Sequence, residues 1–145
     1  MIETLKIYFF TEEIRFNLDG KRKIREWISK AAENEDYTIG VLNYIFTNDS
    51  ILLQLNKEYL SHSSLTDIIT FDMSEKKGEI TGDIYISVDR AKENARDYKA
   101  TLANEVHRLL IHGVLHLMGY KDKTQDEKEL MRSKEEFYLS LTPWS

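Results

Sequence analysis

The chain has 145 residues, 41% of them hydrophobic and 31% charged, with a single proline, so it is long enough for one domain with its own core and unlike a disordered or low-complexity chain. It has no cysteine, which excludes disulfide scaffolds, thiolate zinc sites and cysteine nucleophiles and leaves His, Asp or Glu as ligands for any transition metal. The formal net charge of −5 argues against a protein that coats nucleic acid through a large basic surface.

Nothing in the sequence predicts a secreted or membrane protein. The N-terminus lacks the basic and then apolar pattern of a signal peptide, and no apolar stretch reaches the roughly 18 residues that spanning a bilayer requires. The chain also has no internal repeat, linker or shift in composition. We therefore expect one cytoplasmic domain over residues 1–145.

The first half of the chain predicts alternating strands and helices. Residues 5–10 and 39–47 are rich in β-forming residues and predict two strands. A turn at Gly20 precedes a helix between them, and Asn48 or Asp49 can cap a second, shorter helix. The expected apolar faces are Ile24, Trp27, Ile28 and Ala31 in the first helix and Leu52, Leu55 and Tyr59 in the second.

A hairpin is predicted in the middle of the chain. Ile68–Asp72 and Ile84–Ser87 have the composition of short strands and are joined by a loop at residues 75–78, and a helix is expected over Val88–Lys99. Strands joined through helices favour parallel pairing, whereas a hairpin is antiparallel. We therefore expect an α+β fold with a small mixed sheet of about four strands.

The last part of the chain predicts two further helices, so that about five helices cover the sheet. One runs from a cap at Thr101 through Met118 to a stop at Gly119, and Thr124 opens the capping box of the other. The final helix is expected to bury Leu130, Phe137, Tyr138 and Leu141.

The chemistry is predicted on the longer helix, whose residues 106–118 read VHRLLIHGVLHLM. Apolar residues on every side indicate a helix surrounded by protein. His112 and His116 are four residues apart, so their imidazoles project within about 40° of one another and can reach one ion. A buried ring nitrogen without a partner costs roughly 1–3 kcal/mol, and a shared metal removes that cost for both rings. The alternative is that each histidine hydrogen-bonds to a core carbonyl or to water.

Two glycines and an aspartate favour the metal site. Gly113 costs about 1 kcal/mol relative to alanine in mid-helix, which indicates that something packs against the backbone between the histidines. Gly119 ends the helix and allows the chain to turn back, so that Asp122 can meet the same ion. The pattern His-x3-His-x5-Asp offers two nitrogens and one carboxylate and leaves a fourth tetrahedral position for water, which is typical of a catalytic metal.

Glu105 and Arg108 lie on the same stripe of this helix as the two histidines. Glu105 is a candidate partner that orients a ligating histidine, and Arg108 is a candidate cation for an anionic substrate. A Glu–Arg pair that only stabilises the helix explains both residues equally well. His107 points away from the stripe and His62 lies in a polar loop, so neither is predicted to be a ligand.

Several enzyme classes have no support in the sequence. Zinc peptidases with an HExxH motif have Glu directly after the first histidine, where this chain has Gly113. The chain also has no glycine-rich phosphate loop, no GxSxG elbow and no GxGxxG turn.

The segment from His112 to Tyr120, HGVLHLMGY, followed by Asp122, resembles the signature of the YbeY family of bacterial metal-dependent endoribonucleases. Weaker matches precede it in the family's order, and an acidic run to Met131 follows it. The preceding matches are Leu55-Asn56 and Tyr59, Thr66-Asp67 and Phe71, and Gly82-Asp83-Ile84 with Ile86-Ser87.

This resemblance implies an α+β domain with one zinc ion on the buried helix and the turn after it, at His112, His116 and Asp122. It also implies a single-strand-specific endoribonuclease that acts in rRNA processing, notably in late maturation of the 16S rRNA 3′ end, and in ribosome quality control. The partners implied are rRNA, the small ribosomal subunit and the GTPase Era, with no membrane.

Three positions depart from the family pattern: Asp122 stands where a third histidine is usual, Leu60 where arginine is usual and Asp72 where proline is usual. The carboxylate lowers the formal charge of a divalent centre by one and makes another divalent ion such as Mn²⁺ more competitive, although two imidazoles still favour zinc. With Leu60, a phosphate contact must come from another cation. The candidates are Arg108, Lys121, Lys123 and the cluster Lys21, Arg22, Lys23 and Arg25.

The leading hypothesis is metal-dependent hydrolysis of phosphodiester bonds in RNA, with Arg108 as the cation that faces the substrate. No general base is evident in the sequence. Two alternatives remain: a ribosome-assembly or RNA-binding factor whose zinc is structural, and a zinc hydrolase of a substrate other than RNA.

Overall fold

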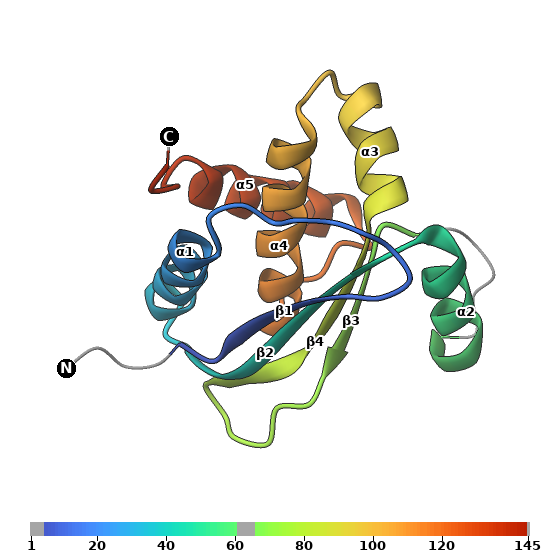
Figure 1. Cartoon of the computed structure of the whole chain (residues 1–145). Helices are drawn as coiled ribbons and strands as arrows, with labels where there is room; N and C mark the ends of the chain where they lie inside the picture. The colour runs from blue at the N-terminus through green and yellow to red at the C-terminus, as the bar shows by residue number, and fades with distance from the viewer. Residues whose placement is uncertain (1–4, 61–65, 145) are drawn as a thin grey trace.

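The computed structural model describes residues 5–60 and 66–144 (Figure 1). Within them, strands and helices follow the predicted order, which confirms the α+β class. The elements are β1 (Ile7–Thr11), α1 (Lys21–Asn34), β2 (Thr38–Thr47), α2 (Asp49–Leu60), β3 (Ile68–Asp72), β4 (Glu79–Ser87), α3 (Val88–Asp97), α4 (Leu102–Leu117) and α5 (Gln125–Leu139).

The four strands form one mixed sheet in the order β1-β2-β4-β3. β1 pairs parallel with β2 and β2 pairs parallel with β4, whereas β3 and β4 form the predicted antiparallel hairpin. β4 begins at Glu79, earlier than the predicted start at Ile84. Its first half contains Gly82 and Asp83, which have low β propensity, but pairing with β2 on one side and β3 on the other makes it a central strand.

The core lies between one face of this sheet and the helices, with α1 and α4 on the same side of the sheet (Figure 1). Alternate side chains of β2 and β4, such as Tyr44 and Ile84, are buried on that face, whereas Tyr8 and Phe10 of β1 are exposed on the other. The hydroxyl of Tyr44 donates to the carbonyl oxygen of Leu110 at 2.8 Å and so ties the sheet to α4. α4 is therefore surrounded by protein, as its apolar sequence predicted.

Two helices bury only part of the faces predicted for them. In α2 Leu52 is buried, but Tyr59 is 64% exposed and packs only edge-on against Phe71. Four residues were predicted to be buried by the final helix, and of these only Tyr138 is buried. Leu130 and Phe137 of α5, and Leu141 after it, are about half exposed. The buried side of α5 consists of Met131, Glu135 and Tyr138. The prediction was wrong because it placed apolar side chains inside, whereas a carboxylate, that of Glu135, lies at the centre of this face.

The described helices are also too short or too polar for a bilayer. None in residues 5–60 and 66–144 has the length and apolarity needed to span a membrane.

Candidate metal centre

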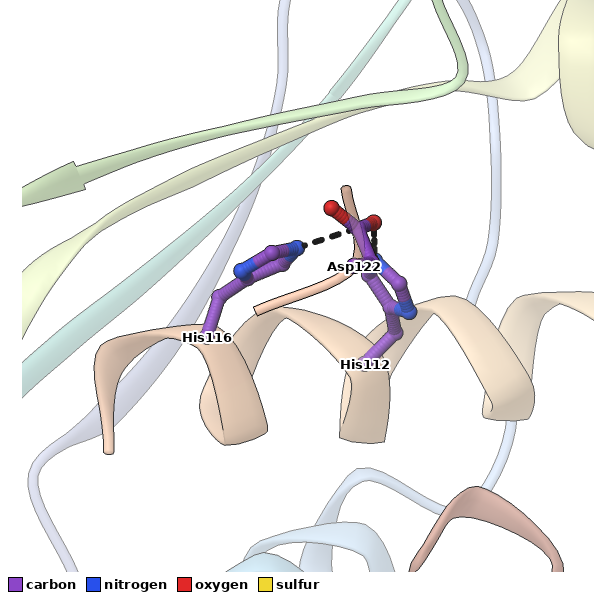
Figure 2. A group of neighbouring side chains, drawn as sticks. All are labelled: His112, His116 and Asp122. Atoms are coloured by element: carbon purple, nitrogen blue, oxygen red, sulfur yellow. Dashed lines mark hydrogen bonds and ion pairs between the residues drawn. The ribbon is translucent and has the colours of Figure 1, made fainter. Parts of the chain in front are cut away.

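The two histidines of α4 and an aspartate after it converge at one point (Figure 2). Nε2 of His112 lies 3.3 Å and Nε2 of His116 lies 3.2 Å from Oδ2 of Asp122. The three candidate ligand atoms all lie within 4.8 Å of one another. His112 is buried, whereas His116 and Asp122 are partly exposed, so the cluster is supported on one side by the core and open to solvent on the other.

Gly113 allows α4 to lie close to the sheet between the two histidines. A Cβ atom at this position would lie 2.8 Å from Cδ1 and from Cγ2 of Ile84, and 3.2 Å from Cδ1 of Ile68. The predicted close packing against the helix backbone is therefore confirmed, and the packing groups are side chains of β3 and β4.

Gly119 makes the turn that returns the chain to the histidines. Its φ of 101° is in the left-handed region that favours glycine, and the next amide, of Tyr120, donates back to the carbonyl oxygen of Leu115 at 3.1 Å. Tyr37 also donates from its hydroxyl to the carbonyl oxygen of Met118 at 3.0 Å. This turn, anticipated from the sequence, positions Asp122 beside the histidines.

A second anchor for the turn is the side chain of Glu35, which follows α1. Its carboxylate accepts hydrogen bonds from the hydroxyls of Tyr120, at 2.5 Å, and Tyr138, and an ion pair from Nζ of Lys134 at 3.1 Å. Burial alone would raise the pKa of Glu35, but these partners outweigh it and lower the pKa. Burial and the bond to Glu35 raise the pKa of Tyr138 to about 12. The carboxylate therefore links α1, the turn and α5.

Glu35→Gln is expected to destabilise the metal-free protein by about 2 kcal/mol at pH 7, because it replaces charge-assisted hydrogen bonds. Since the folded pKa of Glu35 is lowered, its contribution is complete above the ordinary value of 4.5 and is lost as pH falls through the folded pKa. Urea unfolding in the presence of chelator should show a difference in unfolding free energy between the wild type and Glu35→Gln, and this difference should become smaller below that pH. Glu33→Gln, an exposed neighbour, is the control, and a difference independent of pH would contradict this assignment.

Sequence reasoning missed Glu135 of α5, whose carboxylate contacts Nδ1 of His112. The sequence suggested Glu105 as the carboxylate that orients a ligating histidine. Glu105 instead accepts hydrogen bonds from Arg108, at 2.7 Å to its Oε2, and from Asn94 at 2.9 Å. The Glu105–Arg108 pair that the sequence left as an alternative is thus present. No local pattern pointed to Glu135, which is 23 residues beyond His112 and reaches it only through the packing of α5 on α4.

Arg108 lies among three carboxylates. Besides Glu105, its guanidinium is 3.3 Å from Oε1 of Glu135 and 3.7 Å from Oδ2 of Asp67. Burial by itself would lower the pKa of Arg108, but the hydrogen bond with Glu105 and the three negative charges outweigh it and raise the pKa. Arg108 therefore stays charged, and its charge is balanced within the protein.

The candidate ligands line a cleft of about 450 Å³ between α4, the end of α2 and the edge strand β3. Leu60, the last residue of α2, is part of its wall. The remaining lining residues are Thr66, Asp67, Ile68, Ile69, Thr70, Arg108, Leu109, His112, His116 and Asp122. A second cavity of about 430 Å³ lies by the N-terminal half of α4, with Leu102, Val106 and Trp144 in its lining. In the described part of the chain, only the first cavity contains three grouped metal-ligand side chains.

Of the other residues considered from the sequence, His107 packs against the rings of Trp27 and Trp144, as expected for a residue outside the site, and burial lowers its pKa. His62 lies outside the described residues. In the α1 cluster, Nε of Arg25 donates to the carbonyl oxygen of Ile7 at 2.7 Å, which places it near β1, at the opposite edge of the sheet from the cleft.

The chain resembles known proteins over nearly its whole length. Residues 7–142 match the model of the YbeY family, described as endoribonuclease YbeY. A protein of that name from Cytophaga hutchinsonii is 53% identical over 135 residues, which cover 93% of this chain and 94% of the relative. The corresponding protein of Flavobacterium johnsoniae is 45% identical over 132 residues, covering 91% and 94%.

A solved structure has the same fold. The solution structure of a Thermotoga maritima protein aligns with a TM-score of 0.63 and 25% sequence identity, and the alignment covers 92% of this chain and 87% of that one. Together with the sequence matches and the cluster on α4, this establishes that the chain belongs to the YbeY family of endoribonucleases.

Proposed function

We propose that this protein is a zinc-dependent endoribonuclease that hydrolyses phosphodiester bonds in single-stranded RNA. The observation that carries the proposal is the convergence of His112, His116 and Asp122, with ligand atoms within 4.8 Å of one another, on the wall of an open cleft. Family membership supports the reaction class, because relatives matched over nine-tenths of the chain are named endoribonucleases.

The residues present fit a divalent ion. Two imidazole nitrogens and one carboxylate oxygen are a usual donor set for zinc in catalytic sites, and the mixed nitrogen and oxygen set also accepts Mn²⁺. When bound, such an ion supplies Lewis-acid chemistry, since it withdraws charge from a phosphoryl oxygen and makes water a stronger nucleophile at neutral pH. The partly exposed Asp122 and His116 leave this side of the cluster accessible from the cleft.

The cleft itself is suited to holding one strand of RNA near the cluster. Within the described residues its wall at β3 is an edge of the sheet, and its floor is the buried helix α4. Leu60 brings no charge to the cleft, and Arg108 is held by acidic partners. Neither residue therefore supplies a cation free of acidic partners, so recognition depends on the ion and on groups outside the cleft.

The cellular substrate that we propose is precursor rRNA, at the 3′ end of 16S rRNA, with a role in ribosome quality control. The net charge of −5 supports recognition within a ribosomal particle over capture of free RNA by the field of the whole protein. The small ribosomal subunit and the GTPase Era are the partners that this role implies, and the cytoplasm is its compartment.

The test is an endpoint assay with three substrates: a 16S 3′-end precursor, the same sequence in a duplex and a peptide. We expect the protein to cut the single-stranded precursor, to leave the duplex and the peptide intact, and to stop cutting in chelator. Binding of the precursor without cleavage at any metal concentration would contradict the proposal and favour an assembly factor with structural zinc. Cleavage of the peptide alone would favour a hydrolase of another substrate class.

A further inference from the structure

The contact between Glu135 and His112 lies on the side of the imidazole ring away from Asp122. Glu135 is 5% exposed and touches Nδ1 of His112, while Nε2 of the same ring faces Oδ2 of Asp122 at 3.3 Å. A carboxylate accepts hydrogen bonds and cannot donate one, so Nδ1 must carry the proton for this contact to be favourable. The lone pair of a neutral His112 ring is then on Nε2, where an ion shared with Asp122 would accept it.

Glu135 is itself fixed at both carboxylate oxygens. Oε2 contacts His112, and Oε1 accepts from Arg108 at 3.3 Å. Arg108 is held in turn by two hydrogen bonds to Glu105, at 2.9 and 2.7 Å. The chain of contacts from Glu105 through Arg108 and Glu135 to His112 is therefore continuous, and each charged member has a partner of opposite sign or a ring N–H.

The two histidines differ in the hydrogen-bond partner of Nδ1 and in exposure. In the described part of the chain, no hydrogen bond to Nδ1 of His116 is present, whereas Nδ1 of His112 has Glu135. His116 is also more exposed than His112, with 25% of its side chain accessible against 11%. The ring of His112 is thus the more buried member of the pair and the one with a partner at Nδ1.

We propose that Glu135 is a positioning residue of the metal centre: it fixes the tautomer and orientation of His112, and Arg108 holds Glu135 in place. The inference rests on the proposed metal site. Carboxylates that accept from the second nitrogen of a ligating histidine raise its basicity, and their loss typically weakens metal binding about 10- to 100-fold. Arg108 acts in this arrangement through Glu135.

The experiment measures Zn²⁺ affinity, by competition with a chromophoric chelator, for the wild type, Glu135→Ala, Glu135→Gln and Glu136→Ala. Glu136 is the adjacent, exposed residue of α5 and serves as the matched control. We expect Glu135→Ala to bind about 10- to 100-fold more weakly, Glu136→Ala to match the wild type, and Glu135→Gln to recover part of the loss, because its amide oxygen can still accept from Nδ1. Equal affinity of Glu135→Ala and the wild type would overturn the inference and leave the metal site intact.

A second measurement uses the wild-type protein alone, so it does not require the Glu135 variants to fold. Long-range ¹H–¹⁵N spectra of the metal-free wild type report which nitrogen of a neutral His112 ring carries the proton when no ion binds Nε2. We expect the proton on Nδ1, and a proton on Nε2 of His112 would overturn the inference even if Glu135→Ala proved unstable. A wild type that binds no divalent ion at all would instead contradict the proposed function, so the two failures are distinguishable.

Discussion

Asp122→Ala is expected to weaken divalent-metal binding by more than about 100-fold, since loss of a ligand should exceed the 10- to 100-fold effect of losing a hydrogen-bond partner of a ligand. RNA cleavage should be lost with it. The side chain of Asp122 is 40% exposed and contacts the two histidines, so its removal should leave the fold and its stability nearly unchanged. Metal content after dialysis, cleavage rate and the thermal unfolding midpoint of the metal-free protein are the measurements.

Asp126→Ala is the matched control for this change, since it removes an exposed carboxylate in the first turn of α5, four residues further along the chain. It should retain metal and activity. Asp122→Ala that is folded, contains no metal and still cleaves RNA at the rate of the wild type would sink the assignment of this cluster to catalysis.

Gly113→Val should cost about 3 kcal/mol of unfolding free energy, at the upper end of what overpacking of a core usually costs. Its Cβ alone would lie 2.8 Å from two atoms of Ile84, and the branched side chain adds two further methyl groups at the contact between α4 and the sheet. Relief requires α4 to move away from β3 and β4, which would also displace His112 and His116. The unfolding free energy measured in urea and the zinc affinity should therefore both be lower than in the wild type.

The control is Ala103→Val, which introduces the same residue at an exposed position of the same helix. It should cost less than about 1 kcal/mol, the difference in helix propensity. If Gly113→Val proved no more destabilising than this control, it would contradict the claim that close packing of α4 on the sheet requires glycine at position 113.

Local signals explain why much of the site could be predicted from the sequence. The helix repeat places histidines four residues apart on one side of the helix. A glycine in the middle of a buried helix indicates close packing against its backbone, and a glycine at the end of a helix indicates a turn. These three features predicted the places of His112, Gly113, His116 and the turn at Gly119 correctly. The order of strands and helices followed in the same way from caps, turns and apolar periodicity.

The misses share a physical cause, which is contact between segments far apart in the chain. Glu135 lies on the buried face of α5 because it contacts His112 and Arg108. Leu130 and Phe137 therefore lie on the exposed side of the helix. A pattern of apolar residues cannot show this, because the stabilising partners are on α4. Glu35 likewise fixes the turn before Asp122 through tyrosines more than 80 residues away.

The central claim is that one ion at His112, His116 and Asp122 is required for RNA cleavage. The most direct measurement strips the protein with a chelator, restores zinc stepwise, and follows bound metal and cleavage of a single-stranded rRNA precursor in the same samples. We predict that cleavage is absent in the stripped protein, rises in proportion to bound zinc and levels off at one ion per chain. Full cleavage by the metal-free protein, or no cleavage after one zinc per chain is bound, would contradict the account.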